Sequence, residues 1–161
     1  MSVSLPILTN LGSLGEHEKR QKLLLANVLA AGIIGFGLAI GIAIVSGGIM
    51  ASYGPGFGSG RPTLVLQVFA AGIAAIVGVI GQFIISIGAM WWLIFLQAIW
   101  AAVNLSLTWV LRGKGAEGVA LAYLLAYVVH LGATSGVTFW KLRVTTKELR
   151  PLDTVLESAR A

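Results

Sequence analysis

Residues 113–140 read GKGAEGVALAYLLAYVVHLGATSGVTFW, an apolar segment that is long enough to cross a membrane. Four polar side chains follow at i, i+4, i+7 and i+11 and therefore share one helix face: Tyr123, Tyr127, His130 and Thr134. Unpaired polar groups are costly in hydrocarbon, so we expect this face to point towards neighbouring helices or a wet cavity. The segment predicts a helix that needs helical partners.

The composition is that of an integral membrane protein. Of the 161 residues 57% are hydrophobic and 11% are charged, and the mean hydropathy is +0.91, which lies outside the range of soluble domains. With no cysteine and only two histidines, we expect no disulfide, no metal site and no cofactor. The net charge of +5 is spread over short loops and both ends, so topology explains it better than nucleic-acid binding does.

The predicted fold class is an all-α membrane protein with four transmembrane helices, which together occupy residues 23–140. Gly- and Pro-rich or very short connections separate the spans. The expected spans are residues 23–50, 62–88, 91–111 and 118–140.

The two ends flank this bundle. Residues 1–22 form an N-terminal segment, which is either the stump of an earlier helix or an interfacial or disordered end. Residues 141–161 are expected to be a tail in which Pro151 interrupts any helix, although a short amphipathic helix on the membrane surface is an alternative.

The distribution of Lys and Arg predicts the orientation. With four crossings, both termini and the 88–91 turn lie on one side, which carries eight of these residues. The other side carries three: Arg61, Arg112 and Lys114. Because positive charge accumulates on the cytoplasmic side, we expect a multi-pass protein of a prokaryotic inner membrane with both termini in the cytoplasm.

Small residues four positions apart predict close helix packing, because missing side chains let two backbones approach. One such pair is Ala31 with Gly35. The other pairs are Gly37 with Gly41, Ala74 with Gly78, and Gly132 with Gly136.

A second polar seam lies on the third span, where Gln97 and Asn104 are seven residues apart and share a face. With Tyr123, Tyr127, His130 and Thr134, these residues are candidates for lining a cavity that accepts a sugar-like or amphipathic substrate. The alternative is that they only join helices through hydrogen bonds. His130 is either a proton site or a neutral, hydrogen-bonded residue.

No enzyme site is visible, and we do not expect this chain to be an enzyme. All Asp and Glu residues lie in flanks or loops, so no orienting acid stands beside a base and nucleophile within the spans. The spans carry no Asp, Glu, Lys or Arg that would mark an ion-coupled or multidrug pump.

Taken in order, these features resemble the C-terminal part of polysaccharide-biosynthesis membrane proteins, the Wzx-type oligosaccharide-lipid flippases. Their superfamily also holds multidrug and toxic-compound exporters and lipid II flippases. The matching pieces cover residues 3–143 and are Leu5-Pro6 before the charged run 16–22, Ile49-Met50-Ala51-Ser52-Tyr53-Gly54 with Phe57, Asn104 with Leu111, and Gly115-Ala116-x-Gly118-x-Ala120-x-Ala122.

The resemblance implies export of a polyprenyl-linked oligosaccharide by alternating access, for O-antigen, capsule or exopolysaccharide assembly. Such flippases have two helix bundles, whereas one set of four spans is expected here, without the charged cavity residues that would hold a pyrophosphate. We therefore expect a fragment that is inactive alone and whose partners are the bilayer, the lipid-linked oligosaccharide, and either missing N-terminal helices or another membrane subunit. The alternative is a stand-alone, homo-oligomeric small transporter or assembly subunit; a membrane enzyme ranks last.

Overall fold

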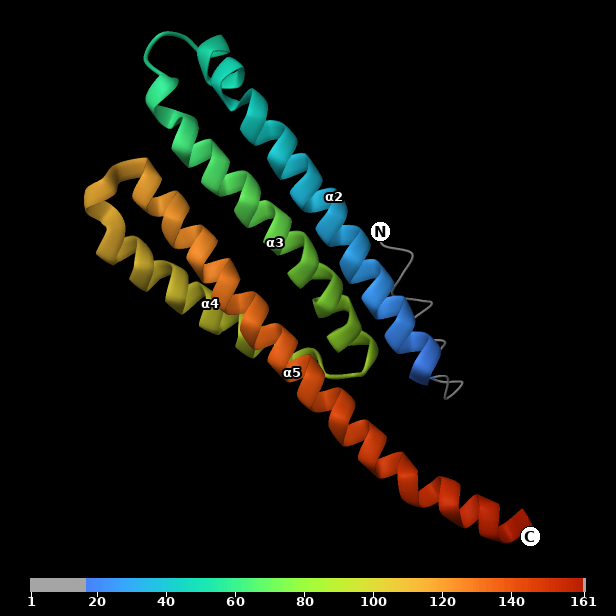
Figure 1. Ribbon diagram of the computed structural model, residues 1–161. Helices are drawn as coiled ribbons and strands as arrows, with labels where there is room; N and C mark the ends of the chain where they lie inside the picture. Colours follow the sequence, from blue (N-terminus) through green and yellow to red (C-terminus); the bar gives the residue numbers. More distant parts are fainter. Residues whose placement is uncertain (1–16, 161) are drawn as a thin grey trace.

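The computed structural model describes residues 17–160, and this part of the chain is almost entirely helical (Figure 1). Side chains are described for Lys19 and for residues 21–143. The predicted N-terminal segment therefore lies mostly outside the described residues. Four long helices and two 3-10 turns follow in order: α2 (His17–Ser52), η1 (Gly58–Gly60), α3 (Arg61–Ser86), α4 (Met90–Leu111), η2 (Arg112–Lys114) and α5 (Gly115–Arg160).

Three continuous helical stretches are long and apolar enough to cross a membrane: Gln21–Ser52, Gly58–Ser86 and Met90–Arg143. The sequence predicted four separate spans, and within the described residues this number is corrected to three. The difference arises at residues 112–114, where η2 replaces the expected loop and joins α4 to α5 without a break in helical structure. The chain direction still reverses there, and α4 and α5 pack side by side (Figure 1).

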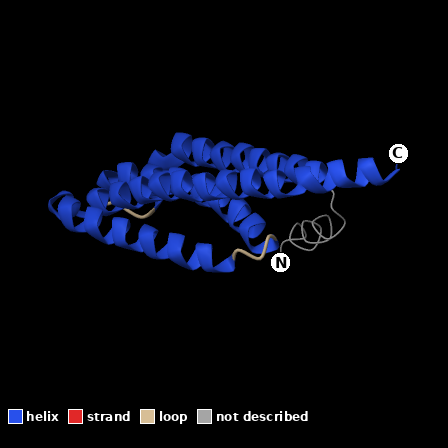
Figure 2. Cartoon of the chain, turned by 90° about the horizontal axis from the view of Figure 1, so that it is seen from below, coloured by secondary structure: helices blue, strands red, loops and turns tan. Residues whose placement is uncertain are grey.

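Helix α3 lies at the centre of the packing. It packs against α2 on one side and against α5 on the other, whereas α4 packs mainly against α5. Figure 2 shows the helices from below, with short loops between them. The spatial order is therefore α2, α3, α5, α4. The buried hydrophobic side chains of α3 form most of the core: Ala70, Ile73, Val77, Ile80, Phe83 and Ile84.

Helices α2 and α3 approach each other closely at Gly35 and Gly72. A Cβ added to Gly35 would lie 3.2 Å from the Gly72 Cα, tighter than an ordinary van der Waals contact. The rings of Phe36 and Phe69 pack next to this contact, with centroids 6.2 Å apart. Two facing glycines let the backbones come together, which favours association where lipid gives no hydrophobic driving force between helices.

The other predicted glycine pairs do not pack in this way. Five of these glycines lie on exposed faces, with no atom of another helix within 4 Å of an added Cβ in the described structure. Within the described residues these glycines therefore make no close helix contact, because no neighbouring helix comes within 4 Å of an added Cβ. The five are Gly37, Gly41, Gly78, Gly132 and Gly136.

The turn between α3 and α4 is fixed by backbone hydrogen bonds around Gly88, whose φ is +71°. The Gly88 N–H donates to the Ile85 carbonyl at 2.9 Å, and the Ala89 N–H donates to the Ile84 carbonyl at 3.1 Å. This is the bond pattern of a Schellman motif, in which a left-handed glycine ends a helix. The motif sends the chain back into α4 at once.

Helix α5 is longer than the predicted span 118–140. It runs to Arg160 and extends beyond the bundle (Figure 1). The sequence predicted that Pro151 would interrupt any helix, yet the helix continues through it. A proline inside a helix removes one backbone hydrogen bond.

The Gly35–Gly72 contact gives a direct prediction. Gly35→Val would force side-chain atoms against the α3 backbone, and we expect a loss of about 1–3 kcal/mol in the free energy of unfolding. Gly37→Val is the matched control, because it makes the same change two residues away where an added Cβ meets nothing within 4 Å. Thermal unfolding in detergent, followed by circular dichroism, measures both. Equal effects of the two variants would contradict this packing.

Candidate functional site

The polar face of α5 meets α4 in an aromatic cluster centred on Trp100. Its indole ring lies 5.8 Å from the ring of Tyr123, 5.2 Å from that of Tyr127 and 6.5 Å from that of His130, measured between centroids. Tyr123 and Tyr127 also contact each other at 5.0 Å. Tilted and edge-on arrangements of this kind are the favourable ones for aromatic pairs.

The burial of this face agrees with the expected inward orientation. His130 is 4% exposed and Thr134 is fully buried, although both lie on an apolar helix of membrane length. Tyr123 and Tyr127 are half-buried. The α5 face is therefore covered by protein, as the sequence predicted for a polar stripe in a span.

A cavity of about 490 Å³ opens between α3, α4 and α5. We call it the α3/α4/α5 groove. Its polar lining comes from Gln82 on α3, Gln97 on α4, and Tyr127 and His130 on α5. Its apolar lining includes Ala74, Gly78 and Gly81, whose small size keeps the α3 wall open. Three of the six predicted cavity residues, Gln97, Tyr127 and His130, thus come together at one groove.

The other three candidates lie elsewhere on the same helix pair. Asn104, Tyr123 and Thr134 do not line the α3/α4/α5 groove. Tyr123 belongs to the aromatic cluster around Trp100, which joins α4 to α5. The α4 seam thus contributes Gln97 to the groove, and the contact of α4 with the polar face of α5 is made by Trp100.

Several buried polar atoms in this region have no hydrogen-bond partner among the described residues. They are the Trp100 Nε1, the Asn104 Oδ1, the His130 Nδ1 and the Thr134 Oγ1. A polar atom buried in an apolar environment without a partner costs about 1–3 kcal/mol. These groups have the capacity to bond a polar ligand or water inside the bundle.

The groove carries no Asp, Glu, Lys or Arg among its lining residues. Among the described residues, no group of three or more His, Cys, Asp or Glu side chains could hold a metal ion. The chemistry available at the groove is therefore hydrogen bonding by amides, a phenol and an imidazole, together with contacts to aromatic and aliphatic surface.

Sequence reasoning did not single out Trp100 as a site residue. The sequence spacing could have identified it. Trp100 lies three residues after Gln97 and four before Asn104, so all three share one helix face. Tryptophans at the ends of a span are typical of membrane interfaces. Trp100 instead lies in the middle of α4 and faces α5.

No protein-family model, curated protein or solved structure matches this chain. The function of the groove is therefore inferred from its own residues and from the sequence features described above.

The aromatic cluster yields a stability prediction. Tyr127 contacts three rings, so Tyr127→Leu should lower the free energy of unfolding by about 2 kcal/mol, since each aromatic pair contributes about 0.5–1.5 kcal/mol beyond its buried area. Tyr127→Phe keeps the ring and should unfold close to the parent temperature. Near-ultraviolet circular dichroism and thermal unfolding in detergent separate the two variants. If Tyr127→Leu were as stable as Tyr127→Phe, the ring contacts would not hold α4 to α5.

Proposed function

We propose that this chain is a membrane-embedded helix bundle of an exporter for lipid-linked oligosaccharides. The observation that carries the proposal is the α3/α4/α5 groove, which combines amide, phenol and imidazole groups with apolar walls on helices of membrane length. The order of sequence motifs that resembles oligosaccharide-lipid flippases supports the same class of substrate.

The groove suits a molecule that is part sugar and part hydrocarbon. Gln97, Tyr127 and His130 offer donors and acceptors to sugar hydroxyls, and tyrosine also offers an aromatic face to a sugar ring. Ile85 and Leu93, which line the same groove, suit the isoprenoid chain. A soluble, strongly charged substrate would find no ionic partner there.

The neutral lining also limits what the chain does by itself. A diphosphate needs cationic partners, and the described lining residues of the groove supply none. Alternating access further requires two bundles that move against each other around the substrate. We therefore propose that the chain works with a second bundle, formed either by further helices of the same protein or by another subunit, and is inactive without it.

The arrangement of the helices supports a topology for this role. The first turn of α2, the α3–α4 turn and the C-terminal half of α5 lie towards one end of the molecule, and η1 and η2 lie at the other (Figure 1). We propose that the third apolar stretch, Met90–Arg143, crosses the membrane twice, once in α4 and once in the antiparallel helix α5. The end rich in Lys and Arg then faces the cytoplasm.

A second candidate, a self-associating small transporter or assembly subunit, is favoured by the outer faces of α2 and α4. Ile33 and Ile44 on α2 are 74% and 75% exposed, and Trp91 on α4 is 81% exposed. Such faces suit lipid, but they would equally suit a second copy of the chain. This candidate predicts one defined oligomer in detergent.

Photolabelling tests the proposed function. In native membranes, a polyprenyl-diphosphate oligosaccharide with a photoreactive group on its first sugar should label peptides containing Gln97 and Tyr127. Unlabelled substrate should compete, and Gln97→Ala should weaken this competition about fivefold, as expected for one lost hydrogen bond. Ser106→Ala on the exposed part of α4 is the control and should change nothing.

Two outcomes would contradict this function. Labelling spread evenly over the lipid-facing residues, as a photoreactive phospholipid would give, would show that the groove is not a glycan site. Flipping of the glycan lipid by the purified chain alone in proteoliposomes would refute the requirement for a second bundle and favour the self-associating transporter.

A further inference from the structure

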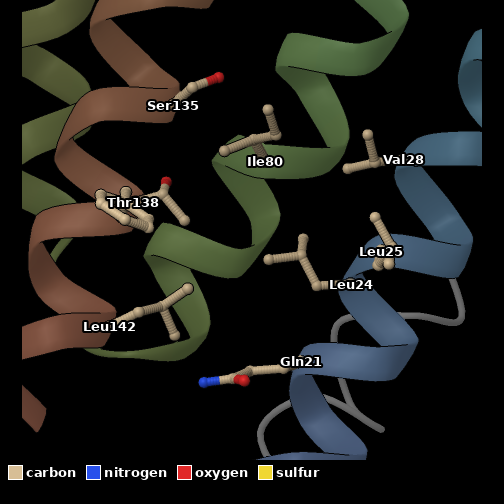
Figure 3. A pocket seen from close by; sticks show the side chains of 9 residues that line it. Gln21, Leu24, Leu25, Val28, Ile80, Ser135, Thr138 and Leu142 are labelled. Atoms are coloured by element: carbon tan, nitrogen blue, oxygen red, sulfur yellow. The ribbon is translucent and has the colours of Figure 1, made fainter. Parts of the chain in front are cut away.

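A second groove lies between α2 and α5, with α3 as its floor (Figure 3). It encloses about 300 Å³ and is mainly apolar. We call it the α2/α5 groove. Leu24, Leu25 and Val28 form the α2 wall, Ile80 forms the floor, and Ser135 and Phe139 belong to the α5 wall.

The dimensions of the α2/α5 groove fit a hydrocarbon chain rather than a helix. Its lining covers residues 21–28 of α2 and 135–142 of α5, which corresponds to about 10 Å along each helix. This length is only about two turns of a helix, so the groove offers a second helix little contact, whereas one acyl chain can lie along it. An unfilled apolar gap would lose dispersion contacts, so an acyl chain of the surrounding bilayer is the fitting occupant.

One end of the groove is polar and basic. The Gln21 amide points from α2 into the groove at this end (Figure 3). On α5, the Cζ of Arg143 lies 4.2 Å from the ring centroid of Phe139, a groove residue. Lys22 follows Gln21 on α2. The described side chains at this end include four basic ones, Lys19, Lys22, Lys141 and Arg143, so this end carries positive charge.

We propose that the α2/α5 groove binds one anionic phospholipid, with an acyl chain between α2 and α5 and the headgroup at Gln21, Lys22 and Arg143. Basic pockets between transmembrane helices on the cytoplasmic side recognise anionic headgroups, and each Lys or Arg near the surface contributes to this attraction. This site lies apart from the α3/α4/α5 groove and depends only on the chain crossing a membrane, so it goes beyond the proposed function.

The lipid would connect two helices that otherwise pack through α3. The principal packing pairs are α2 with α3, α3 with α5 and α4 with α5. An acyl chain in contact with Leu25 and Phe139, which are 60% and 56% exposed, would bury surface of α2 and α5 at once. The bound lipid therefore acts as a structural part of the bundle.

Native mass spectrometry of the purified full chain tests this site, with phosphatidylglycerol and phosphatidylcholine of identical acyl chains as probes. We expect one phosphatidylglycerol to stay bound in preference to phosphatidylcholine. The double variant Lys22→Gln/Arg143→Gln should lower this preference about tenfold. Arg112→Gln/Lys114→Gln is the matched control at the other end of the bundle, where the Cζ of Arg112 also lies over an aromatic ring, that of Trp109, at 4.1 Å.

A second pair of variants tests the acyl chain. Ser135→Phe fills the groove and should reduce retention of both lipids, whereas Ser106→Phe makes the same change on the exposed part of α4 and should not. Equal retention of the two lipids by the parent chain, or an equal loss of preference in both charge variants, would overturn the proposal. A lipid-free dimer that Ser135→Phe dissociates would overturn it too, because the occupant would then be a second copy. No glycan is present, so these results are independent of export.

Discussion

The sandwiching of α3 between α2 and α5 is the constraint on which the rest of the structure depends. The Gly35–Gly72 contact brings α2 against one side of α3, and the Arg61 Nε donates to the Ser46 Oγ at 3.0 Å near the loop end of the same pair. With α5 on its other side, α3 is the most deeply buried helix. Because α4 then packs on α5 rather than next to α2, each of the two inner helices becomes the floor of a groove.

The two grooves differ in chemistry in a way that follows from these positions. The α3/α4/α5 groove receives the polar face of α5, and its lining is neutral. The α2/α5 groove receives apolar side chains and ends where the basic segments of the chain begin. Polar groups placed inside the bundle and charges placed only at its ends satisfy the same rule, because hydrocarbon penalises charge far more than it penalises a hydrogen-bonding group.

The sequence predicted those parts of the structure that depend on composition and period. The lengths of the apolar segments predicted the first and last residues of α3 and α4 to within two residues. The spacing of Tyr127 and His130 predicted which face of α5 points inward. The sequence could not predict which helix faces which. It shows that residue 72 is a glycine, but it does not show that Gly35 of α2 lies opposite. For the same reason the contact of Trp100 with α5 was not predicted. The 3-10 turn at residues 112–114 was not predicted either, because the glycines there are typical of a loop.

The central claim is that the α3/α4/α5 groove provides a polar path between helices that are otherwise apolar. Thiol labelling tests it without background from this chain, because its 161 residues include no cysteine. In membranes, Gln97→Cys should react with a water-soluble maleimide, whereas Leu105→Cys, on a side chain that is 70% exposed on the apolar surface of the same helix, should not. Reaction of Gln97→Cys as slow as that of Leu105→Cys would show that the groove is closed to water, and the account of a polar substrate path would be wrong.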